Sequence, residues 1–162
     1  VAKNNLSSAE KELKEIEKLR TNKNVEELII WEINSAGILI KIAYEVLSGE
    51  IAAKNKNYNA AIAHLKKAVE LEYTLRYDEP PTWFYPCSQN LGAVLIEAGK
   101  YAEAEKVYLK NLEDVPENGW SLFGLHQSVL KQNRIDEAGE IQKRFNEAWK
   151  NADVTLTSSR IM

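Results

Sequence analysis

Few side chains in this sequence have the type and spacing of a catalytic or metal-binding site. The only histidines, His64 and His126, lie 62 residues apart, and the single cysteine is Cys87. Metal ligands often come in pairs spaced as CxxC or HExxH, and neither motif occurs. Cys87 lies near a predicted helix start, where a helix dipole lowers a thiol pKa, but we favour buried packing for it. We expect structural or surface roles for all three, with no metal, no cofactor and no enzymatic activity.

Carboxylates are plentiful, and any two of them offer an acid–base pair. Glu97, Glu103 and Glu105 surround a predicted helix–helix turn, so we interpret them as solvated surface charges. Asp78 and Glu79 precede two prolines, which favours a helix-end and loop device over a metal site. The serines lack a His–Asp companion at a suitable spacing. General acid–base and nucleophilic catalysis are therefore not indicated.

The composition is that of an ordinary globular protein. Its 162 residues, 44% of them hydrophobic, suffice for one continuous core or one array of repeats. A net charge of −3 leaves no basic excess, so we expect no nucleic-acid partner. The apolar run Ala36–Ala43 is interrupted by Lys41 and falls short of the roughly 18 residues of a membrane span, so we expect no membrane partner.

The chain begins at Val1, and residues 1–13 look like the end of one helix, a turn and the start of another. We interpret the sequence as a fragment whose partner helix lies upstream. A cytoplasmic location is favoured, although targeting signals would have been lost with the missing part. One cysteine excludes an internal disulfide framework.

The element that must position any site is a pair of short helices predicted over Leu91–Pro116, with a Gly-Lys turn between them. An apolar residue follows the turn, and an alanine follows three residues later. The same pattern recurs with its alanines at Ala9, Ala61, Ala104 and Ala138. The last spacing is 34 residues, the period of a repeated helix-turn-helix unit, and we interpret the longer spacings as insertions.

This period predicts an all-α chain. Its parts are a partial repeat at 1–20, an insertion at 21–34, repeats at 35–79, 80–116 and 117–151, and a C-terminal tail at 152–162. The insertion is expected to hold a short helix over Val25–Ile33, with a strand at Ile29–Trp31 as the alternative. The second helix of the 35–79 repeat is expected to reach about Tyr77, because no proline stops it earlier.

Small residues mark the contacts between helices, since antiparallel helices approach to about 8–10 Å only where side chains are small. We expect Gly49 to lie opposite Ala61 and Gly92 opposite Ala104. The full set of predicted helix contacts is Gly49, Ala61, Ala68, Gly92, Ala104 and Ala138. His126 takes the place of the expected fourth glycine, and we hypothesise that Gly124 and Gly139 give its imidazole room.

The 34-residue unit, with its Gly-x-Tyr-x-x-Ala core, resembles the tetratricopeptide repeat (TPR). The stretches GEIAAKNKNYNAAIAHLKKAVELE and LGAVLIEAGKYAEAEKVYLKNLEDVPENGWSLFGL resemble the C-terminal repeats of uncharacterised bacterial TPR proteins. The resemblance runs from about Ser35 to the end. It implies a TPR-like α–α superhelix, a right-handed solenoid of antiparallel helix pairs that serves as a protein-interaction scaffold. Some such proteins clamp a peptide carboxylate with lysines and asparagines; Asn90 matches one asparagine, but Gln89 replaces a lysine.

The repeat phase places the first helix of each repeat along a concave groove. The candidates for contacting a peptide there are Trp83, Tyr85, Gln89, Asn90, Glu97, Trp120, Phe123, Gln127 and Lys131. The aromatic members would make binding hot spots. The alternative is that they only seal the packing between repeats.

These patterns predict a non-catalytic scaffold that binds a peptide or helix of a partner protein, of unknown identity, in the groove. Two alternatives remain. The segment is a terminal cap of a longer array that self-associates as a homodimer through Leu13, Ile16 and Leu19, or it is an accessory domain of an enzyme encoded upstream.

Overall fold

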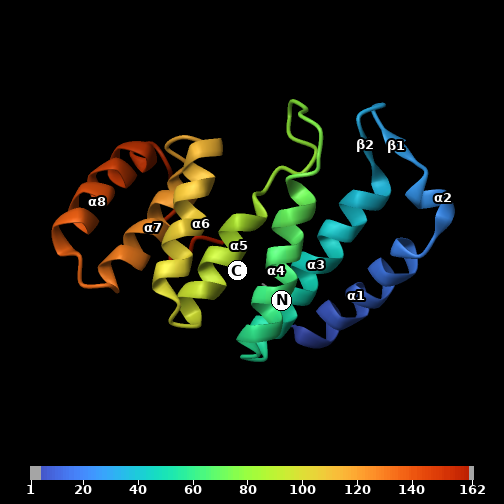
Figure 1. The fold of residues 1–162 in the computed structure, drawn as a ribbon, viewed down its shortest axis with the longest axis horizontal. Helices are drawn as coiled ribbons and strands as arrows, with labels where there is room; N and C mark the ends of the chain where they lie inside the picture. The colour runs from blue at the N-terminus through green and yellow to red at the C-terminus, as the bar shows by residue number, and fades with distance from the viewer. Residues whose placement is uncertain (1–4, 161–162) are drawn as a thin grey trace. The chain divides into compact units, whose positions relative to one another are not determined.

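The computed structural model describes residues 5–160 of the chain. This part holds eight helices and one small two-stranded ribbon, so the predicted all-α class is confirmed apart from that ribbon (Figure 1). The chain forms two compact units, unit 1 at Val1–Cys87 and unit 2 at Ser88–Met162. Across the described residues, no helix combines the length and apolar character that crossing a bilayer demands.

Unit 1 is built around one long helix that packs against two others. Its elements are α1 (Leu6–Arg20), α2 (Lys23–Glu26), β1 (Ile29–Ile30), β2 (Asn34–Ser35), α3 (Ala36–Lys54) and α4 (Tyr58–Glu72). Helix α3 packs against both α1 and α4. The Ser35 hydroxyl caps α3 by accepting from the Ile38 amide at 3.2 Å, as expected of an N-cap serine.

The prediction of a helix over Val25–Ile33 is wrong. Helix α2 ends at Glu26, and Ile29 and Ile30 pair antiparallel with Ser35 and Asn34. β-branched isoleucines suit this short ribbon better than a helix. The chain reverses at Trp31, whose φ of 51° is left-handed.

The prediction that α4 reaches Tyr77 is also wrong, since the helix ends at Glu72. The Asn34 side chain accepts from the Arg76 amide at 2.9 Å and donates to the Arg76 carbonyl at 3.0 Å. These bonds satisfy the Arg76 backbone groups without a helix, so the chain leaves the helical path. Residues 73–86 then form an irregular connection that lies at the same end of unit 1 as the β1–β2 ribbon (Figure 1).

Unit 2 contains four helices, with α7 packed against both α6 and α8. They are α5 (Cys87–Glu97), α6 (Tyr101–Asp114), α7 (Gly119–Leu130) and α8 (Ile135–Trp149). Asn118 caps α7 by accepting from the Ser121 amide at 3.1 Å. The buried core takes apolar residues from three helices: Val94, Leu95, Tyr108, Leu122, Leu125 and Val129.

The turns between paired helices repeat in backbone conformation as well as in sequence. Lys56, Gly99 and Asn133 stand two residues before the apolar residue that opens the next helix, with φ values of 59°, 74° and 60°. In each turn, the next amide bonds to a carbonyl five residues back: Asn57 to Ala52, Lys100 to Leu95 and Arg134 to Val129. This is the Schellman geometry of a left-handed helix end. Three equivalent helix hairpins therefore recur along the chain.

Candidate functional site

The Tyr108 ring on α6 is the packing centre of unit 2 and is fully buried. A Cβ atom added to Gly92 of α5 would lie 2.3 Å from its Cζ atom, and one added to Gly124 of α7 would lie 2.2 Å from it. The ring therefore fills space that only glycines leave on both neighbouring helices. Gly124 serves Tyr108, and Gly139 is exposed with open space beside it. The hypothesis that these two glycines make room for His126 is wrong.

After α8 the chain turns back as residues 150–160, which we call the return segment. The Trp149 ring marks the turn, because a Cβ atom on Gly119 would lie 2.2 Å from its Cε3 atom. Its indole Nε1 donates to the Val154 carbonyl at 2.7 Å. Packing against Gly119 and this hydrogen bond together fix the direction in which the chain leaves α8.

The end of the return segment is buried against α5 and α6. The Ser159 hydroxyl is hydrogen-bonded to the Tyr108 hydroxyl, and it also donates to the Gln89 carbonyl at 3.5 Å. The Arg160 guanidinium lies 2.6 Å from the Glu97 carboxylate, with its side chain only 6% exposed. A buried charge is costly unless it is paired, so Glu97 stabilises this placement of Arg160.

A cavity of about 120 Å³ remains beside the return segment. It is lined by Ala93, Ile96 and Glu97 of α5, Gln127 of α7, and Thr157, Ser158 and Ser159 of the return segment. Its walls therefore combine two apolar side chains with one carboxylate and one amide. The segment covers this face without filling it.

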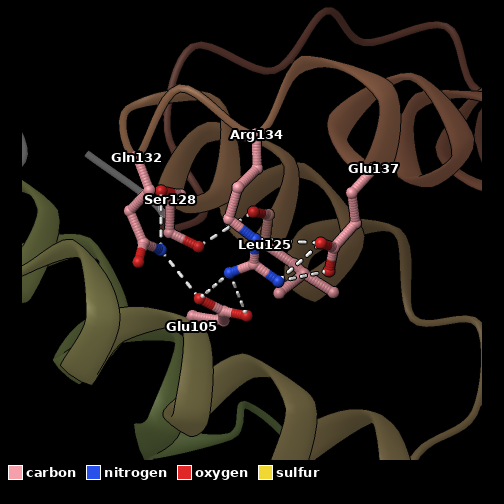
Figure 2. Close-up of polar contacts among 6 residues, drawn as sticks. All are labelled: Glu105, Leu125, Ser128, Gln132, Arg134 and Glu137. Carbon is pink, nitrogen blue, oxygen red and sulfur yellow. Dashed lines mark hydrogen bonds and ion pairs between the residues drawn. The ribbon is translucent and has the colours of Figure 1, made fainter.

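Polar side chains tie α6 to the turn between α7 and α8, as Figure 2 shows. The Glu105 carboxylate accepts from Arg134 at 2.7 and 2.8 Å and from the Gln132 amide at 2.7 Å. Arg134 also donates to Glu137, at the start of α8. Burial alone would raise the pKa of Glu105, but the bonds from Arg134 and Gln132 outweigh burial and hold that pKa below its usual value. This network keeps α7 in place behind the cavity.

The predicted groove residues of unit 2 separate into two groups. Glu97 and Gln127 line the cavity, whereas Gln89 and Asn90 are buried within the unit. The Gln89 amide donates to the side chain of Asn118 at 3.0 Å and so links α5 to the start of α7. Lys131 is exposed at the end of α7.

The aromatic candidates of α7 pack on α8. The ring of Trp120 makes an edge contact with Trp149 at 5.7 Å between centroids, and that of Phe123 lies 5.6 Å from Phe145. These two side chains lie where the sealing interpretation places them.

In unit 1, Trp83 packs against a core cluster that includes Ile42, Ala68 and Cys87, and Tyr85 is half-buried. The neighbouring Phe84 is 82% exposed. Trp83 therefore holds the 73–86 connection onto α3 and α4.

The predicted small helix contacts are buried in both units. A Cβ atom on Gly49 would lie 2.6 Å from Cγ of Leu65 and 3.3 Å from the Ala61 carbonyl. At Gly92 the nearest atoms belong to Tyr108, one turn beyond Ala104. The alanines of this set, all at most 1% exposed, are Ala61, Ala68, Ala104 and Ala138.

The residues whose chemistry drew attention first lie apart from the cavity lining. Burial, reinforced by the Glu72 carboxylate, raises the pKa of the Cys87 thiol far above its usual value. His64 Nδ1 lies 2.6 Å from Glu45 in unit 1, and burial lowers the pKa of His126 in unit 2. Among residues 5–160, no cluster of three or more His, Cys, Asp or Glu side chains is arranged to hold a metal ion.

Sequence reasoning missed the residues that join the return segment to the helices. Ser159 and Arg160 lie in a stretch without helical periodicity, so only its composition was available. One signal pointed to Tyr108: it stands four residues after Ala104, where the equivalent repeat has Leu65 after Ala61. A hydroxyl at a core position needs a partner, and that partner lay outside the repeat.

Neither comparison with known proteins adds a name to these features: no protein-family model matches the chain, and the search of curated proteins finds no match.

Proposed function

We propose that this chain is a non-catalytic, TPR-like interaction module that binds an extended peptide segment of a partner protein on the face formed by α5 and α7. Two features support the TPR-like part of the proposal. The helix hairpins recur at the spacing expected for such repeats, and their turns share one left-handed geometry. Stacked hairpins of this kind form extended concave binding surfaces.

The return segment is the observation that carries the proposal. A stretch without helix or strand lies against α5 and α6, with Leu156, Ser159 and Arg160 buried. Its contacts come from both side chains and backbone of the helical face. A surface that accommodates an extended segment of its own chain has the shape and the polar groups to accept one from another protein.

The chemistry of this face suits binding. The cavity lining offers one carboxylate, one amide, and alanine and isoleucine side chains. The Cys87 thiol, the most nucleophilic side-chain type, is buried in unit 1 and held protonated by its raised pKa. A peptide ligand would be held by the same bonds that hold the return segment.

The test uses the full chain with Ser159→Ala and Arg160→Glu, which we call the opened chain. Losing the hydroxyl and placing two carboxylates together should release the return segment. A fluorescent peptide of residues 153–160 is then titrated by anisotropy, and saturable binding is expected. The control is Lys150→Glu, which reverses an exposed charge of the same segment and should leave the face covered. An opened chain that keeps its circular dichroism and melting transition but binds no peptide would contradict the proposed function.

Self-association is a second candidate, favoured by the apolar stripe of α1. Leu13 and Ile16 are half-buried, and Leu19 is 46% exposed. If α1 forms a homodimer contact, the chain should elute as a concentration-dependent dimer in gel filtration. Leu19→Lys should then restore the monomer, and a monomer at all concentrations would contradict this candidate.

A further inference from the structure

The return segment makes two contacts that depend on side-chain identity rather than on backbone. The first involves the hydroxyl of Ser159, which lies between the Tyr108 hydroxyl and the Gln89 carbonyl. A carbonyl only accepts hydrogen bonds, so the ligand side chain must be able to donate. Serine or threonine meets this condition, whereas alanine would leave Tyr108 with a buried hydroxyl that has lost a partner.

The second contact is the buried charge pair between Arg160 and Glu97, with a 2.6 Å approach. A guanidinium is planar and carries five donors, and it is less strongly hydrated than a lysine ammonium. Its desolvation at this site, where the side chain is 6% exposed, is therefore easier than that of lysine. The site favours arginine directly after the hydroxyl residue.

The third feature is space that the resident segment leaves empty. The cavity of about 120 Å³ borders Ser158, which is half-buried, and reaches Ala93 and Ile96 on α5. An apolar cavity of about 150 Å³ admits a molecule as large as benzene, so this space suits an aliphatic side chain. A ligand with leucine in place of Ser158 would cover apolar surface that the return segment leaves open.

Resting on the proposed function, we propose that the face of unit 2 selects a partner peptide with an aliphatic residue, then serine or threonine, then arginine, and that the return segment is a resident, imperfect copy which the partner displaces. The copy needs only modest contacts, because a tethered segment competes at an effective concentration in the millimolar range. Its unfilled cavity gives a better-fitting partner the advantage required for displacement.

The first experiment titrates the opened chain with four peptides. The reference is DVTLTSSR, residues 153–160; the others carry leucine at the Ser158 position, alanine at the Ser159 position, or lysine at the Arg160 position. Relative to the reference, we expect about three- to tenfold tighter binding for leucine. We expect binding about fivefold weaker for alanine and at least about tenfold weaker for lysine. Saturable binding of the reference with less than twofold differences across the series would overturn this inference while leaving the proposed function intact.

The second experiment tests displacement in the intact chain. The reference peptide should bind the intact chain at least about tenfold more weakly than the opened chain, because the resident copy competes. Equal affinities would overturn the claim that the segment is a competitor. A chain ending at Ala152 serves as a second opened variant, and its folding is checked by its melting transition.

A charge exchange isolates the arginine contact from general changes in packing. A chain with Glu97→Arg should reject the reference peptide and bind the peptide with glutamate at the Arg160 position. The matched control, Glu140→Arg on the exposed face of α8, should keep the preference for arginine. If both chains prefer the same peptide, Glu97 does not read the ligand charge. Concentration-dependent dimers of the opened chain would show instead that a second copy occupies the face, which would also overturn the proposal.

Discussion

The two units of this chain close the same helix contact in different ways. In unit 1, Gly49 of α3 receives the side chain of Leu65 from α4; in unit 2, Gly92 of α5 receives that of Tyr108 from α6. Both side chains are fully buried and stand four residues after the repeat alanine. Leucine ends in methyl groups and needs nothing further. Tyrosine carries a hydroxyl through the helix layer to Ser159 of the return segment.

The difference teaches how a repeat position acquires a second role. Apolar packing alone would satisfy the helix hairpin, as it does at Leu65. The hydroxyl of Tyr108 makes the packing centre of unit 2 sensitive to whatever covers the outer face of α5. A bond between the core and a covering segment therefore exists in unit 2, and the equivalent position in unit 1 cannot make one.

The largest predicted effect follows from the two glycines that enclose the tyrosine ring. Gly124→Ala should destabilise unit 2 by about 3 kcal/mol, because the ring is buried and has Gly92 on its other side. Gly49→Ala should cost less, about 1 kcal/mol, since the leucine side chain has more rotamer freedom to yield. Denaturant unfolding of each variant, followed by circular dichroism, measures both.

Gly139→Ala provides the matched control on α8. It is exposed, and nothing lies within 4 Å of an added Cβ atom. An alanine there should stabilise the chain by up to about 1 kcal/mol through helix propensity alone. Equal destabilisation by Gly124→Ala and Gly49→Ala would remove the contrast between the two contacts.

The sequence predicted the helical skeleton well because its signals are local. Caps such as Ser35, the turn before Tyr101 and the 34-residue spacing each depend on residues a few positions apart. The failures came from distant partners. Helix α4 stops at Glu72 because Asn34, 42 residues earlier, binds the Arg76 backbone, and no local pattern encodes that contact.

The candidate site was predictable only in part for the same reason. Repeat phase placed Glu97 and Gln127 on the face that holds the cavity. It did not show that Gln89 would be drawn inward by Asn118, 29 residues away. The return segment has no periodicity, so its partners follow from the assembled fold. Among its residues, only the ability of Arg160 to pair with a carboxylate was visible beforehand.

A smaller effect is expected from removing the hydroxyl that distinguishes Tyr108 from Leu65. Tyr108→Phe keeps the ring between its glycines but loses the bond to Ser159, at a cost of about 1 kcal/mol. Amide exchange in the return segment should quicken at the same time. Tyr101→Phe, at the start of the same helix, is the control and should change stability by less than about 0.5 kcal/mol.

A double-mutant cycle sharpens this test. If the two hydroxyls act through one bond, Ser159→Ala should cost less in the Tyr108→Phe background than in the wild type. Strictly additive costs would mean that the tyrosine hydroxyl is not coupled to the return segment, and the contrast with unit 1 would lose its physical basis.

The smallest predicted effect is a pH dependence of unit 2 that involves Glu105. The folded-state pKa of this carboxyl lies below the reference value of 4.5. Its contribution to stability is therefore fully present above pH 4.5 and is lost as the pH falls through the folded-state pKa. Glu105→Gln should lower the unfolding free energy by about 1 kcal/mol at pH 7.

Near pH 3 the difference between Glu105→Gln and the wild type should shrink, because the wild-type carboxyl becomes protonated as well. Glu137→Gln is the control: its carboxylate also pairs with Arg134 but is half exposed, so water screens the pair. A constant difference between Glu105→Gln and the wild type from pH 7 to pH 3 would show that Glu105 acts through packing rather than charge. The network would then hold α7 behind the cavity by shape alone, as apolar contacts hold Leu65 in unit 1.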